Sequence, residues 1–558
     1  MNQSGPNLSS TTIDSAPLIR QSYRARLTEW LRRPSVILII IVGLLLSRGI
    51  TKGEPFYNND ETRHVMNGVF LRDFLVDRPV THPLNYAYEY YAKYPAIAVP
   101  HWPPFFYFVE GLFFLVFGIS VWASRLAILG FALLGAYFWY RIAERYGPRS
   151  RALVSALVFC LLPVVIVFES VTMLEIPQVA LCLGTIFFWL RWVERERAAD
   201  VWAMAGFAAA AMLTSQKSVF LAVFLGLDLL LNRRFRLLRN WHLGAALIAS
   251  LTAVVPWYLL SFRMLTTSYR RAIGDNFQHV ARLQTVLYYP RNLPGQLGIV
   301  LLILACIGIC WVAFRRQSQY RFLLLWVFSA YLSFTLIREK EPRHIIIWLP
   351  PLVYFALLGI EAVWPWRRWL WVAYGALALY FLVIGIRFQR PRLKGVEDAA
   401  RFVLAQPGSD IVYYQGRLNG DFIFYVRQLD PQKRHMVARD KQVVVTNIDY
   451  ARQPLLLASE EILDFFQTWG IKYIIIENKD ADPGLGVVRE VLETDRFERA
   501  ATFPIQTNDA YGEPGEITVY RFHGVPRRSS QIVSIPMLTI HGNIPADLSR
   551  LAGRPWPN

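Results

Sequence analysis

The chain has 558 residues, of which 54% are hydrophobic, 15% aromatic and 18% charged. One soluble core could not bury so much apolar surface, and long uncharged segments recur through the first 390 positions, which excludes an ordinary soluble enzyme and indicates a polytopic α-helical membrane protein. The formal net charge of +18 does not indicate nucleic-acid binding, because the arginines lie in short clusters between apolar segments, the distribution that membrane orientation imposes.

The N-terminal segment, residues 1–34, is predicted to be a cytoplasmic tail that precedes the first membrane span. A basic stretch from Arg20 to Arg33 stands before the apolar run, and no convincing small-residue cleavage site follows it. We therefore expect an uncleaved anchor with its N-terminus in the cytoplasm. The polar segment after the anchor, residues 51–122, then lies on the extracytoplasmic side and carries the candidate catalytic loop.

The short apolar segment from Phe105 to Ile119 decides the topology of the rest. As a helix it would be about 22 Å long against a hydrocarbon thickness of about 30 Å, and it carries Glu110 in its middle. Treating it as an interfacial or re-entrant helix places five arginine clusters in the cytoplasm, whereas a full span would place the next cluster outside. We therefore predict about eleven spans, at residues 35–50, 123–141, 151–168, 176–192, 200–214, 217–232, 242–261, 295–314, 321–337, 344–362 and 368–388.

With an odd number of spans, the C-terminus lies on the extracytoplasmic side of the membrane. The unusual polar residues of the membrane domain, residues 35–390, then all lie on that same side. The extracytoplasmic segments are then residues 51–122, Glu169 to Glu175, Thr214 to Lys217, 262–294 and Arg338 to Arg343. Within them, the charged stretch from Arg263 to Tyr289 is interpreted as a flap over the site, or as a solvated loop.

Beyond residue 390 the apolar runs shorten and charges alternate with them, which is typical of an α/β domain. We predict an extracytoplasmic α/β domain over residues 391–525, with strands at 411–414, 443–445, 473–476 and 517–520 and helices at 396–404, 460–469 and 487–492. The proline-containing tail, residues 526–558, is expected to be irregular.

The polar stretch from Pro55 to His64 is the candidate reaction centre. Asp60, Glu61, Arg63 and His64 stand close together where a chain leaving a bilayer meets water. The alternative is a solvated juxtamembrane loop without a chemical role.

Four segments occur in an order that resembles one superfamily. They are the Pro55 to His64 stretch, Trp102 to Tyr107 before a short aromatic helix, Leu174 to Pro177 at the start of a span, and Glu339 to His344 leading into Leu349-Pro350-Pro351. The chain is similar to the GT-C glycosyltransferases, in the bacterial branch related to dolichyl-phosphate-mannose protein mannosyltransferases and the lipid A aminoarabinose transferase. The resemblance covers about residues 35–390 and, weakly, the domain after them.

The resemblance implies transfer of a sugar from a polyprenyl phosphate carrier, with an essential acidic residue in the first external loop. That position corresponds to Asp60, with Glu61 beside it, while Glu175 corresponds to a second acidic position where most relatives have aspartate. The chemistry suits these residues, because a carboxylate can deprotonate an acceptor hydroxyl while cations stabilise the departing phosphate. Glu175 is equally interpreted as an N-cap for the span from Ile176, and Glu169 is a weaker candidate.

The cations expected to bind the donor phosphate lie at external ends of spans and are Lys217, Lys340, Arg343 and His344. Lys217 resembles a lysine that follows a Thr-turn between two spans in relatives, although a lysine snorkelling to the interface gives the same pattern. Arg343 resembles a basic residue before the Pro-Pro span, and the alternative is an ion pair with Glu339 or Glu341.

The chain departs from the aminoarabinose transferase at His101-Trp102, where that relative has a Glu-Lys pair, and this argues against aminoarabinose as the donor sugar. His101 is interpreted as a proton carrier or hydrogen-bond donor, or as a packed ring, and joins Arg63 and His64 as a further site candidate. The acidic residues and histidines are dispersed, so we predict no metal site and no obligatory cofactor, with a divalent cation as the alternative.

Together these features predict an inverting glycosyltransferase of the cytoplasmic (inner) membrane that moves one sugar from a polyprenyl (undecaprenyl) monophosphate to lipid A, another glycan or a protein outside. Asp60 is the expected general base, Glu61 and Glu175 shape the site, and Lys217, Arg343 and Lys340 bind the phosphate. The alternatives are a flippase for polyprenyl-linked sugars or another transporter, for which no internal repeat is found, and a non-catalytic lipid-binding assembly protein.

Overall fold

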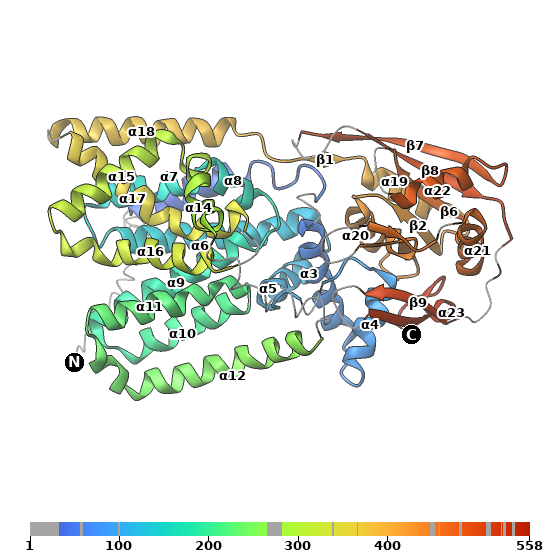
Figure 1. Cartoon of the computed structure of the whole chain (residues 1–558), viewed down its shortest axis with the longest axis horizontal. Helices are drawn as coiled ribbons and strands as arrows, with labels where there is room; N and C mark the ends of the chain where they lie inside the picture. Colours follow the sequence, from blue (N-terminus) through green and yellow to red (C-terminus); the bar gives the residue numbers. More distant parts are fainter. Residues whose placement is uncertain are drawn as a thin grey trace, which may run out of the picture.

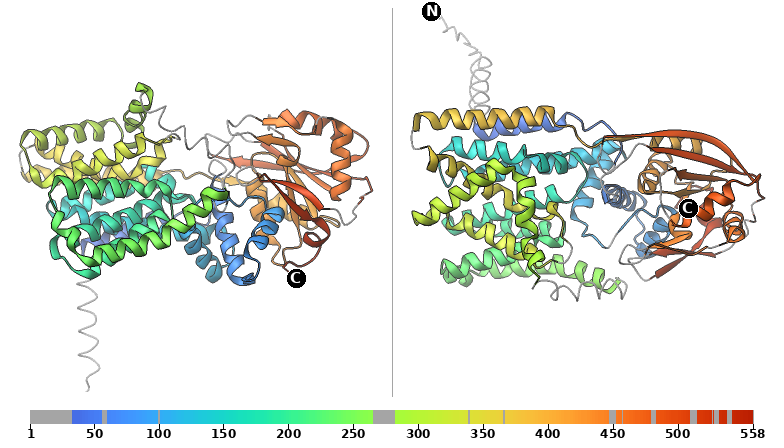
Figure 2. Two further views of the ribbon diagram at one scale, coloured as in Figure 1. Left: turned by 60° about the horizontal axis from the view of Figure 1, so that its bottom comes forward. Right: turned by 45° about the horizontal axis from the view of Figure 1, so that its top comes forward.

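The computed structural model describes residues 33–55, 60–98, 101–264, 282–337, 340–364, 367–446, 452–456, 458–478, 483–508, 515–525, 527, 532–537 and 542–557. Figures 1 and 2 show a bundle of long helices on one side, an α/β region on the other, and three shorter helices between them. The flap proposed for Arg263 to Tyr289 falls largely outside the described residues, as do Glu339 and residues 56–59.

The bundle contains a helix at each of the eleven segments predicted to span the membrane. Its helices are α2 (Pro34–Ser47), α6 (Val121–Ala143), α7 (Arg149–Cys160), α8 (Pro163–Ser170), α9 (Glu175–Arg195), α10 (Ala198–Met212), α11 (Phe220–Leu231), α12 (Trp241–Met264), α14 (Leu283–Leu297), α15 (Ile299–Phe314), α16 (Arg321–Thr335), α17 (Leu349–Val363) and α18 (Arg367–Arg387). Two 3₁₀ helices, η1 (Gln216–Val219) and η5 (Pro342–Trp348), precede α11 and α17.

Five helices of the described chain are long and apolar enough to cross a membrane, and up to seven if each of two bent pairs counts as one span. The bend between α7 and α8 is 62° and falls at Pro163, whose ring cannot continue the helix before it. The bend between α14 and α15 is 118° and falls at Gly298, which adopts a φ of 79°. Helices suited to crossing a membrane are therefore present in the described chain, and the number of spans stays a prediction.

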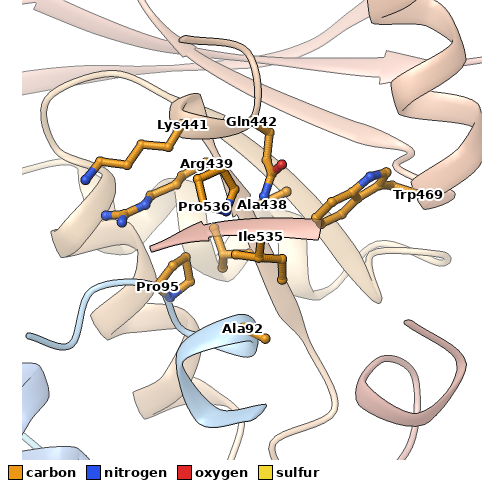
Figure 3. A pocket seen from close by; sticks show the side chains of 10 residues that line it. Ala92, Pro95, Ala438, Arg439, Lys441, Gln442, Trp469, Ile535 and Pro536 are labelled. Atoms are coloured by element: carbon orange, nitrogen blue, oxygen red, sulfur yellow. The ribbon is translucent and has the colours of Figure 1, made fainter. Parts of the chain in front are cut away.

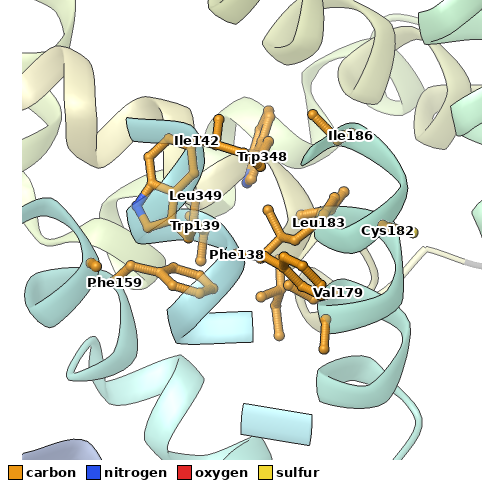
Figure 4. Close-up of a cluster of buried hydrophobic side chains, with 14 of the residues drawn as sticks. Phe138, Trp139, Ile142, Phe159, Val179, Cys182, Leu183, Ile186, Trp348 and Leu349 are labelled. Carbon is orange, nitrogen blue, oxygen red and sulfur yellow. The ribbon is translucent and has the colours of Figure 1, made fainter. Parts of the chain in front are cut away.

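The core of the bundle lies where α6, α7 and α9 meet α17. Figure 4 shows Trp139, Phe159, Leu183 and Trp348 packed together there, all buried. By contrast, α12 and α18 leave most of their apolar side chains exposed, which suits helices that face lipid. The bundle thus has a packed core and, along α12 and α18, an apolar outer surface.

The α/β region is built on a six-stranded sheet with the order β1-β7-β8-β6-β2-β3. Its strands are β1 (Leu393–Lys394), β2 (Ile411–Gln415), β3 (Met436–Arg439), β6 (Tyr473–Glu477), β7 (Phe497–Thr507) and β8 (Gly515–Phe522), and its helices are α19 (Val396–Leu404), α20 (Asn419–Leu429), α21 (Ser459–Trp469) and α22 (Pro483–Leu492). β2 runs parallel to β3 and β6, with Tyr413 opposite Ala438 and Ile474, whereas β8 is antiparallel to β6 and β7. Every residue of β2 and β6 is buried, as expected for strands covered on both faces.

The strands predicted at 411–414, 473–476 and 517–520 and the three predicted helices are present. The strand predicted at 443–445 forms instead a separate two-stranded sheet, β4 (Val444–Thr446) with β5 (Arg452–Pro454). The expectation of an irregular tail is corrected, because β9 (Ile532–Met537) and β10 (Gly542–Asp547) form an antiparallel hairpin followed by α23 (Leu548–Leu551). Prolines are tolerated there because each strand of a two-stranded ribbon has one unpaired edge, and along that edge a missing backbone N–H costs no hydrogen bond between strands.

Three helices, α3 (Asp60–Asp77), α4 (Pro83–Lys93) and α5 (Phe105–Phe117), connect the two regions. The polar stretch expected to be a loop is therefore, from Asp60 onward, the first turn of α3, where two acidic residues suit the positive end of the helix dipole. The far end of α3 is tied to α20 by a buried ion pair, in which Arg427 Nε and Nη2 lie 2.7 and 2.8 Å from the two oxygens of Asp73. This ion pair therefore fixes the position of α3, the helix that begins at Asp60, against the α/β region.

Candidate active site

The candidate site lies where the ends of several helices meet. Asp60 and Glu175 are the first residues of α3 and α9, Lys217 lies in η1, and Arg343 lies in η5. The guanidinium of Arg343 links the acidic residues: Nη2 is 3.0 Å from Asp60 Oδ2, and Nε is 3.5 Å from Glu175 Oε1. Segments predicted to share one side of the membrane therefore converge on one cluster.

Glu341 completes the ring of carboxylates around Arg343, with its Oε2 2.7 Å from Arg343 Nε. Only 8% of the Arg343 side chain is exposed, against 24% for Asp60 and 44% for Glu341. A buried arginine needs partners of opposite charge, and here it has three. Arg63 adds a second, more exposed cation 3.9 Å from Asp60. The ion pair with Glu341 that the sequence suggested as an alternative role for Arg343 is thus present together with the contacts to Asp60 and Glu175.

His64 lies beside this cluster on α3, with Nδ1 2.6 Å from the hydroxyl of Tyr107 and its ring centroid 4.5 Å from that of Trp102. Burial lowers the pKa of His64 to about 3; Asp60 opposes this shift, while Arg343, Lys217 and Arg63 reinforce it. Burial, with Arg63, likewise lowers the pKa of His101 to about 4. Both rings are therefore neutral near pH 7, which suits hydrogen bonding and packing better than proton transport.

Glu61 points away from its neighbour Asp60, because successive side chains of a helix diverge by about 100°. Its buried Oε1 accepts a hydrogen bond of 2.8 Å from the backbone N–H of Thr172 and lies 4.0 Å from Arg125 Nη2. Arg125 also donates to the backbone carbonyls of Lys52 and Glu54. In these contacts Glu61 anchors the start of α3 to α6 and to the segment between α8 and α9.

The remaining candidates lie around η5. The side-chain ammonium of Lys340 donates a hydrogen bond to the backbone carbonyl of Ile337, and partial burial lowers its pKa. The backbone carbonyl of Lys340 accepts a hydrogen bond of 2.8 Å from the hydroxyl of Tyr288. His344 is buried within η5, where its backbone N–H donates to the carbonyl of Glu341 at 3.1 Å. Glu175 occupies the first helical position of α9 and makes no capping bond, so the N-cap interpretation does not describe it.

Asn67 was missed from the sequence, and Tyr107 was identified only within the Trp102 to Tyr107 segment and not as a site candidate. Asn67 Oδ1 accepts a hydrogen bond of 2.8 Å from the backbone N–H of Ala98 and so ties the chain before His101 to α3. A helical signal was available, because Asp60, His64 and Asn67 follow the i, i+4, i+7 spacing of one helix face. Reading the stretch as a loop concealed it.

Within the described residues no group of three or more His, Cys, Asp or Glu side chains is arranged to hold a metal ion. The carboxylates of Asp60, Glu175 and Glu341 are arranged instead around the guanidinium of Arg343. The three carboxylates thus balance the charge of the Arg343 guanidinium in this arrangement.

Comparison with known proteins gives a match to a family model and to solved structures. The model described as dolichyl-phosphate-mannose-protein mannosyltransferase matches residues 101–259, which contain His101, Glu175 and Lys217. No curated protein sequence matches the chain.

Two structures of ArnT from Cupriavidus metallidurans resemble most of the chain. The apo form is 16% identical with a TM-score of 0.58, and the alignment covers 89% of this chain and 99% of the ArnT chain. The form bound to undecaprenyl phosphate is 15% identical with a TM-score of 0.57, and the alignment covers 88% of this chain and 98% of the ArnT chain. The Archaeoglobus fulgidus oligosaccharyltransferase in complex with Zn and sulfate is 12% identical with a TM-score of 0.53, covering 93% and 76%.

The chain therefore has the fold of the membrane-embedded glycosyltransferases of the GT-C class, and the resemblance drawn from its sequence is confirmed. Within that class its helical region resembles the dolichyl-phosphate-mannose-protein mannosyltransferase family over residues 101–259. The apolar helices agree with a membrane location.

Proposed function

We propose that the chain is an inverting glycosyltransferase that moves one sugar from a polyprenyl (undecaprenyl) monophosphate to an acceptor outside the cytoplasmic membrane. The observation that carries this proposal is the cluster in which Arg343 links Asp60 and Glu175, at 3.0 and 3.5 Å, where the ends of α3, α9 and η5 meet. It pairs an acid that can accept a proton with a cation that can hold a phosphate. The undecaprenyl phosphate bound to the ArnT relative supports the choice of donor class.

The proposed reaction is a single displacement at the anomeric carbon of the donor sugar. Asp60 accepts the proton of the acceptor hydroxyl as its oxygen bonds to the anomeric carbon, and the bond from that carbon to the phosphate oxygen breaks, so that its electron pair leaves with the polyprenyl phosphate. Attack opposite the leaving group inverts the anomeric configuration. Because the departing phosphate gains negative charge, cations held beside it stabilise the transition state more than the ground state.

Arg343 is proposed to exchange partners during this reaction. Before the donor binds, its charge is balanced by Asp60, Glu175 and Glu341. A phosphate forms strong charge-assisted hydrogen bonds with arginine and would compete for the guanidinium, which releases Asp60 to act as a base. Glu341, the most exposed of the three, is the partner most easily displaced into water, whereas the buried Glu175 keeps Arg343 in place.

Lys217 is proposed as the second phosphate ligand, with Lys340 and His344 as further contacts. Lys217 lies near enough to His64 to lower the pKa of that ring electrostatically, which supports its place at the cluster. The neutral rings of His64 and His101, with Trp102 between them, are proposed to shape the pocket for the sugar. No step of the proposed reaction requires a metal ion.

The orientation and domain boundaries belong to the same proposal. The cytoplasmic side carries residues 1–34, residues 35–390 form the membrane domain, and the α/β region from residue 391 lies on the extracytoplasmic side. Support comes from the arrangement in Figure 1, in which the α/β region adjoins the end of the bundle where α3 begins. An acceptor would then reach Asp60 between the two regions.

The decisive experiment is sugar transfer from a panel of radiolabelled polyprenyl-phosphate sugars by the purified chain in detergent, with membrane extract supplying acceptors. Wild type is compared with Asp60→Asn and Lys217→Ala, and with Asp464→Asn as a control, since Asp464 is 64% exposed and pairs only with a surface arginine in the described contacts. We expect transfer or slow hydrolysis of one donor, a loss of several orders of magnitude in Asp60→Asn, a raised donor KM in Lys217→Ala, and no change in the control. Tight donor binding without turnover in wild type would instead favour a transporter or an assembly protein.

A further inference from the structure

The pocket at the junction of α4 with the α/β region, shown in Figure 3, has room for about one water molecule. It is therefore too small for an organic ligand. A cluster of buried polar groups lies elsewhere, where α3, α5, α6 and the segment between α8 and α9 meet. Its members are the side chains of Glu61, Glu110, Ser124 and Thr172, each 0% exposed, and they are named here the Glu110 network.

The Glu110 network is a chain of hydrogen bonds that joins four segments. Ser124 Oγ donates to Glu110 Oε1 at 2.5 Å and lies 2.6 Å from Thr172 Oγ1. Because Ser124 has one hydroxyl proton and donates it to Glu110, the hydroxyl of Thr172 donates to Ser124. The backbone N–H of Thr172 donates in turn to Glu61 Oε1 at 2.8 Å. The network thus connects α5 through α6 to the segment before α9, and that segment to α3.

The carboxyl group of Glu110 also lies directly against the backbone of α3. A Cβ built on Gly68 would lie 2.1 Å from Glu110 Oε2, so that only a glycine leaves room for the carboxyl group there. Glu110 Oε2 has no hydrogen-bond partner among the described residues. Glu110 therefore contacts α3 twice, directly at Gly68 and through the hydrogen bonds that lead to Glu61.

The two acids of the network differ in charge. Glu61 lies 4.0 Å from Arg125 Nη2, whereas no ion pair to Glu110 is found in the described part of the chain. Burial, aided by the charge of Glu61, raises the pKa of Glu110 well above its usual range, against the hydrogen bond from Ser124. Glu110 is therefore uncharged near pH 7. A glutamine amide in its place could accept the same hydrogen bond.

The segments that the network joins carry the two acids that hold Arg343. Asp60 precedes Glu61 at the start of α3, and Glu175 follows Thr172 by three residues at the start of α9. Arg343 reaches from one to the other, at 3.0 Å from Asp60 and 3.5 Å from Glu175. A shift of one helix start against the other would therefore change the distance that Arg343 has to span.

We propose that Glu110 is a positioning residue for the proposed transfer, and that its network fixes the start of α3 against the start of α9 and so sets the spacing of Asp60 and Glu175. This rests on the proposed transferase function and adds to it a residue that touches neither donor nor acceptor. A displacement of about 1 Å in a reacting group can lower a rate about 10²-fold. We expect the loss mainly in kcat, because the position of the base affects the chemical step rather than the binding of the donor.

The first arm of the test measures kcat and donor KM for sugar transfer by the full-length chain. Glu110→Gln keeps an acceptor for Ser124 and should keep kcat within about threefold of wild type, whereas Glu110→Leu should lower kcat about 10- to 100-fold with the donor KM within about threefold. Ser124→Ala should also lower kcat, and adding it to Glu110→Leu should cause little further loss, because both break the same chain. If Glu110→Leu does not fold, Ser124→Ala decides the same question.

Asp228→Leu is the control that separates positioning from loss of stability. Asp228 is also 0% exposed and accepts a hydrogen bond of 2.9 Å from Trp189 Nε1, and it lies eleven residues, about 16 Å along a helix, from Lys217. The control should lower the melting temperature, as Glu110→Leu does, and leave kcat near the wild-type value. Equal kcat losses in Asp228→Leu and Glu110→Leu, or in Glu110→Gln and Glu110→Leu, would overturn the positioning role.

The second arm measures hydrogen exchange at the amide of Thr172 without any substrate. This N–H is bound to Glu61, so it should exchange slowly in wild type, Glu110→Gln and Asp228→Leu, and about tenfold faster or more in Glu110→Leu. Should wild type transfer no sugar while exchange at Thr172 depends on Glu110, the proposed transferase would fail and the network would stand. Wild-type exchange and wild-type kcat in both Glu110→Leu and Ser124→Ala would overturn the network.

Discussion

Arg343 and Asp60 are 283 positions apart in the chain, and the structure brings Nη2 of the first to 3.0 Å from Oδ2 of the second. The arginine comes from η5 at the start of α17 and the aspartate from the first turn of α3. The proposed base and one of the proposed phosphate-binding cations are therefore in direct contact. This contact gives the first prediction.

Replacing Arg343 by alanine should lower transfer by about 10² to 10³-fold, the usual loss when one preorganised donor to a developing negative charge is removed. Arg343→Lys should recover part of the activity, because lysine keeps the positive charge but lacks the planar guanidinium whose N–H groups reach two carboxylates at once. Single-turnover transfer from the identified donor measures both. Arg401→Ala, which breaks an exposed Arg–Glu pair in α19, should behave as wild type. Unchanged transfer in Arg343→Ala would remove Arg343 from the mechanism.

The neutral state of His64 predicts a pH dependence of stability. Its folded pKa of about 3 lies below the ordinary value of about 6.5, so between these values the unfolded chain binds a proton that the folded chain excludes. The free energy of unfolding should therefore rise with pH from about 3 to 6.5, by up to about 1.4 kcal/mol per pH unit from this residue, and level off above.

Thermal unfolding of wild type and His64→Gln across pH 4 to 7 measures this slope. The variant should lose the contribution of His64 and show a flatter curve, whereas His82→Gln, at an exposed histidine, should keep the wild-type slope. Parallel curves for wild type and His64→Gln would show that the pKa of His64 is the same in the folded and the unfolded chain, against the burial seen here.

The buried pair of Asp73 with Arg427 predicts a large stability effect. Burial alone would raise the pKa of Asp73, but Arg427, aided by Lys433, outweighs it and holds the pKa below its usual range. Asp73→Asn should lower the free energy of unfolding by about 3 to 5 kcal/mol, because it leaves a guanidinium buried without its counter-charge. The contribution of this pair should be full above about pH 4 and fall as pH drops through the lowered pKa.

Chemical unfolding of the detergent-solubilised chain tests the pair, with Glu397→Gln as a control at the exposed Arg401 pair, expected to change the free energy by at most about 1 kcal/mol. Because α3 begins at Asp60, Asp73→Asn should also reduce kcat at temperatures where the chain is still folded. Equal effects of the buried and the exposed substitution would contradict the role given to Asp73.

The crossing of α15 and α17 predicts intolerance of added methyl groups. A Cβ on Gly308 would lie 2.0 Å from the carbonyl oxygen of Phe355, and a Cβ on Gly359 would lie 2.0 Å from that of Leu304. Small residues permit such close approach of membrane helices. Gly308→Ala and Gly359→Ala should therefore each lower the free energy of unfolding by at least about 1 to 3 kcal/mol. Gly375→Ala on α18 meets no atom within 4 Å and should be neutral. Melting temperatures in one detergent compare the three, and a neutral Gly308→Ala would mean that the helices can separate.

Removal of divalent cations should leave the transfer rate unchanged, because the proposed base Asp60 and the carboxylates of Glu175 and Glu341 already face Arg343. The measurement is transfer after dialysis against a chelator, followed by addition of Mg²⁺, Mn²⁺ or Zn²⁺ one at a time. A loss of rate that one cation restores would replace Arg343 with a metal ion in the phosphate-binding role.

Local residue patterns were enough to predict much of the architecture. Apolar runs identified the helices of the bundle, since a segment in lipid must satisfy its backbone hydrogen bonds within a helix. Alternating short runs identified β2, β6 and β8, the helix α19 before β2, and the helices α21 and α22 between β2 and β8. The strand β3, the long strand β7 and the hairpin of β9 with β10 were missed. The strands β7, β9 and β10 each contain a proline, which looks locally like a break although it is tolerated where the strand has a free edge.

For the site, the sequence by itself determined the chemical inventory, that is, which acids and cations stand at the ends of apolar segments. It indicated Asp60 as the expected base and Lys217, Arg343, Lys340 and His344 as candidate cations, without pairing any of them with Asp60. Only the tertiary structure decided which of them meet. It turned Glu61 toward Thr172 while Asp60 faces Arg343, made His64 and His101 neutral by burying them, and tied α3 to the α/β region through Asp73 and Arg427. These outcomes depend on the direction of a side chain on its helix and on its burial among segments hundreds of residues away, and no local pattern encodes either.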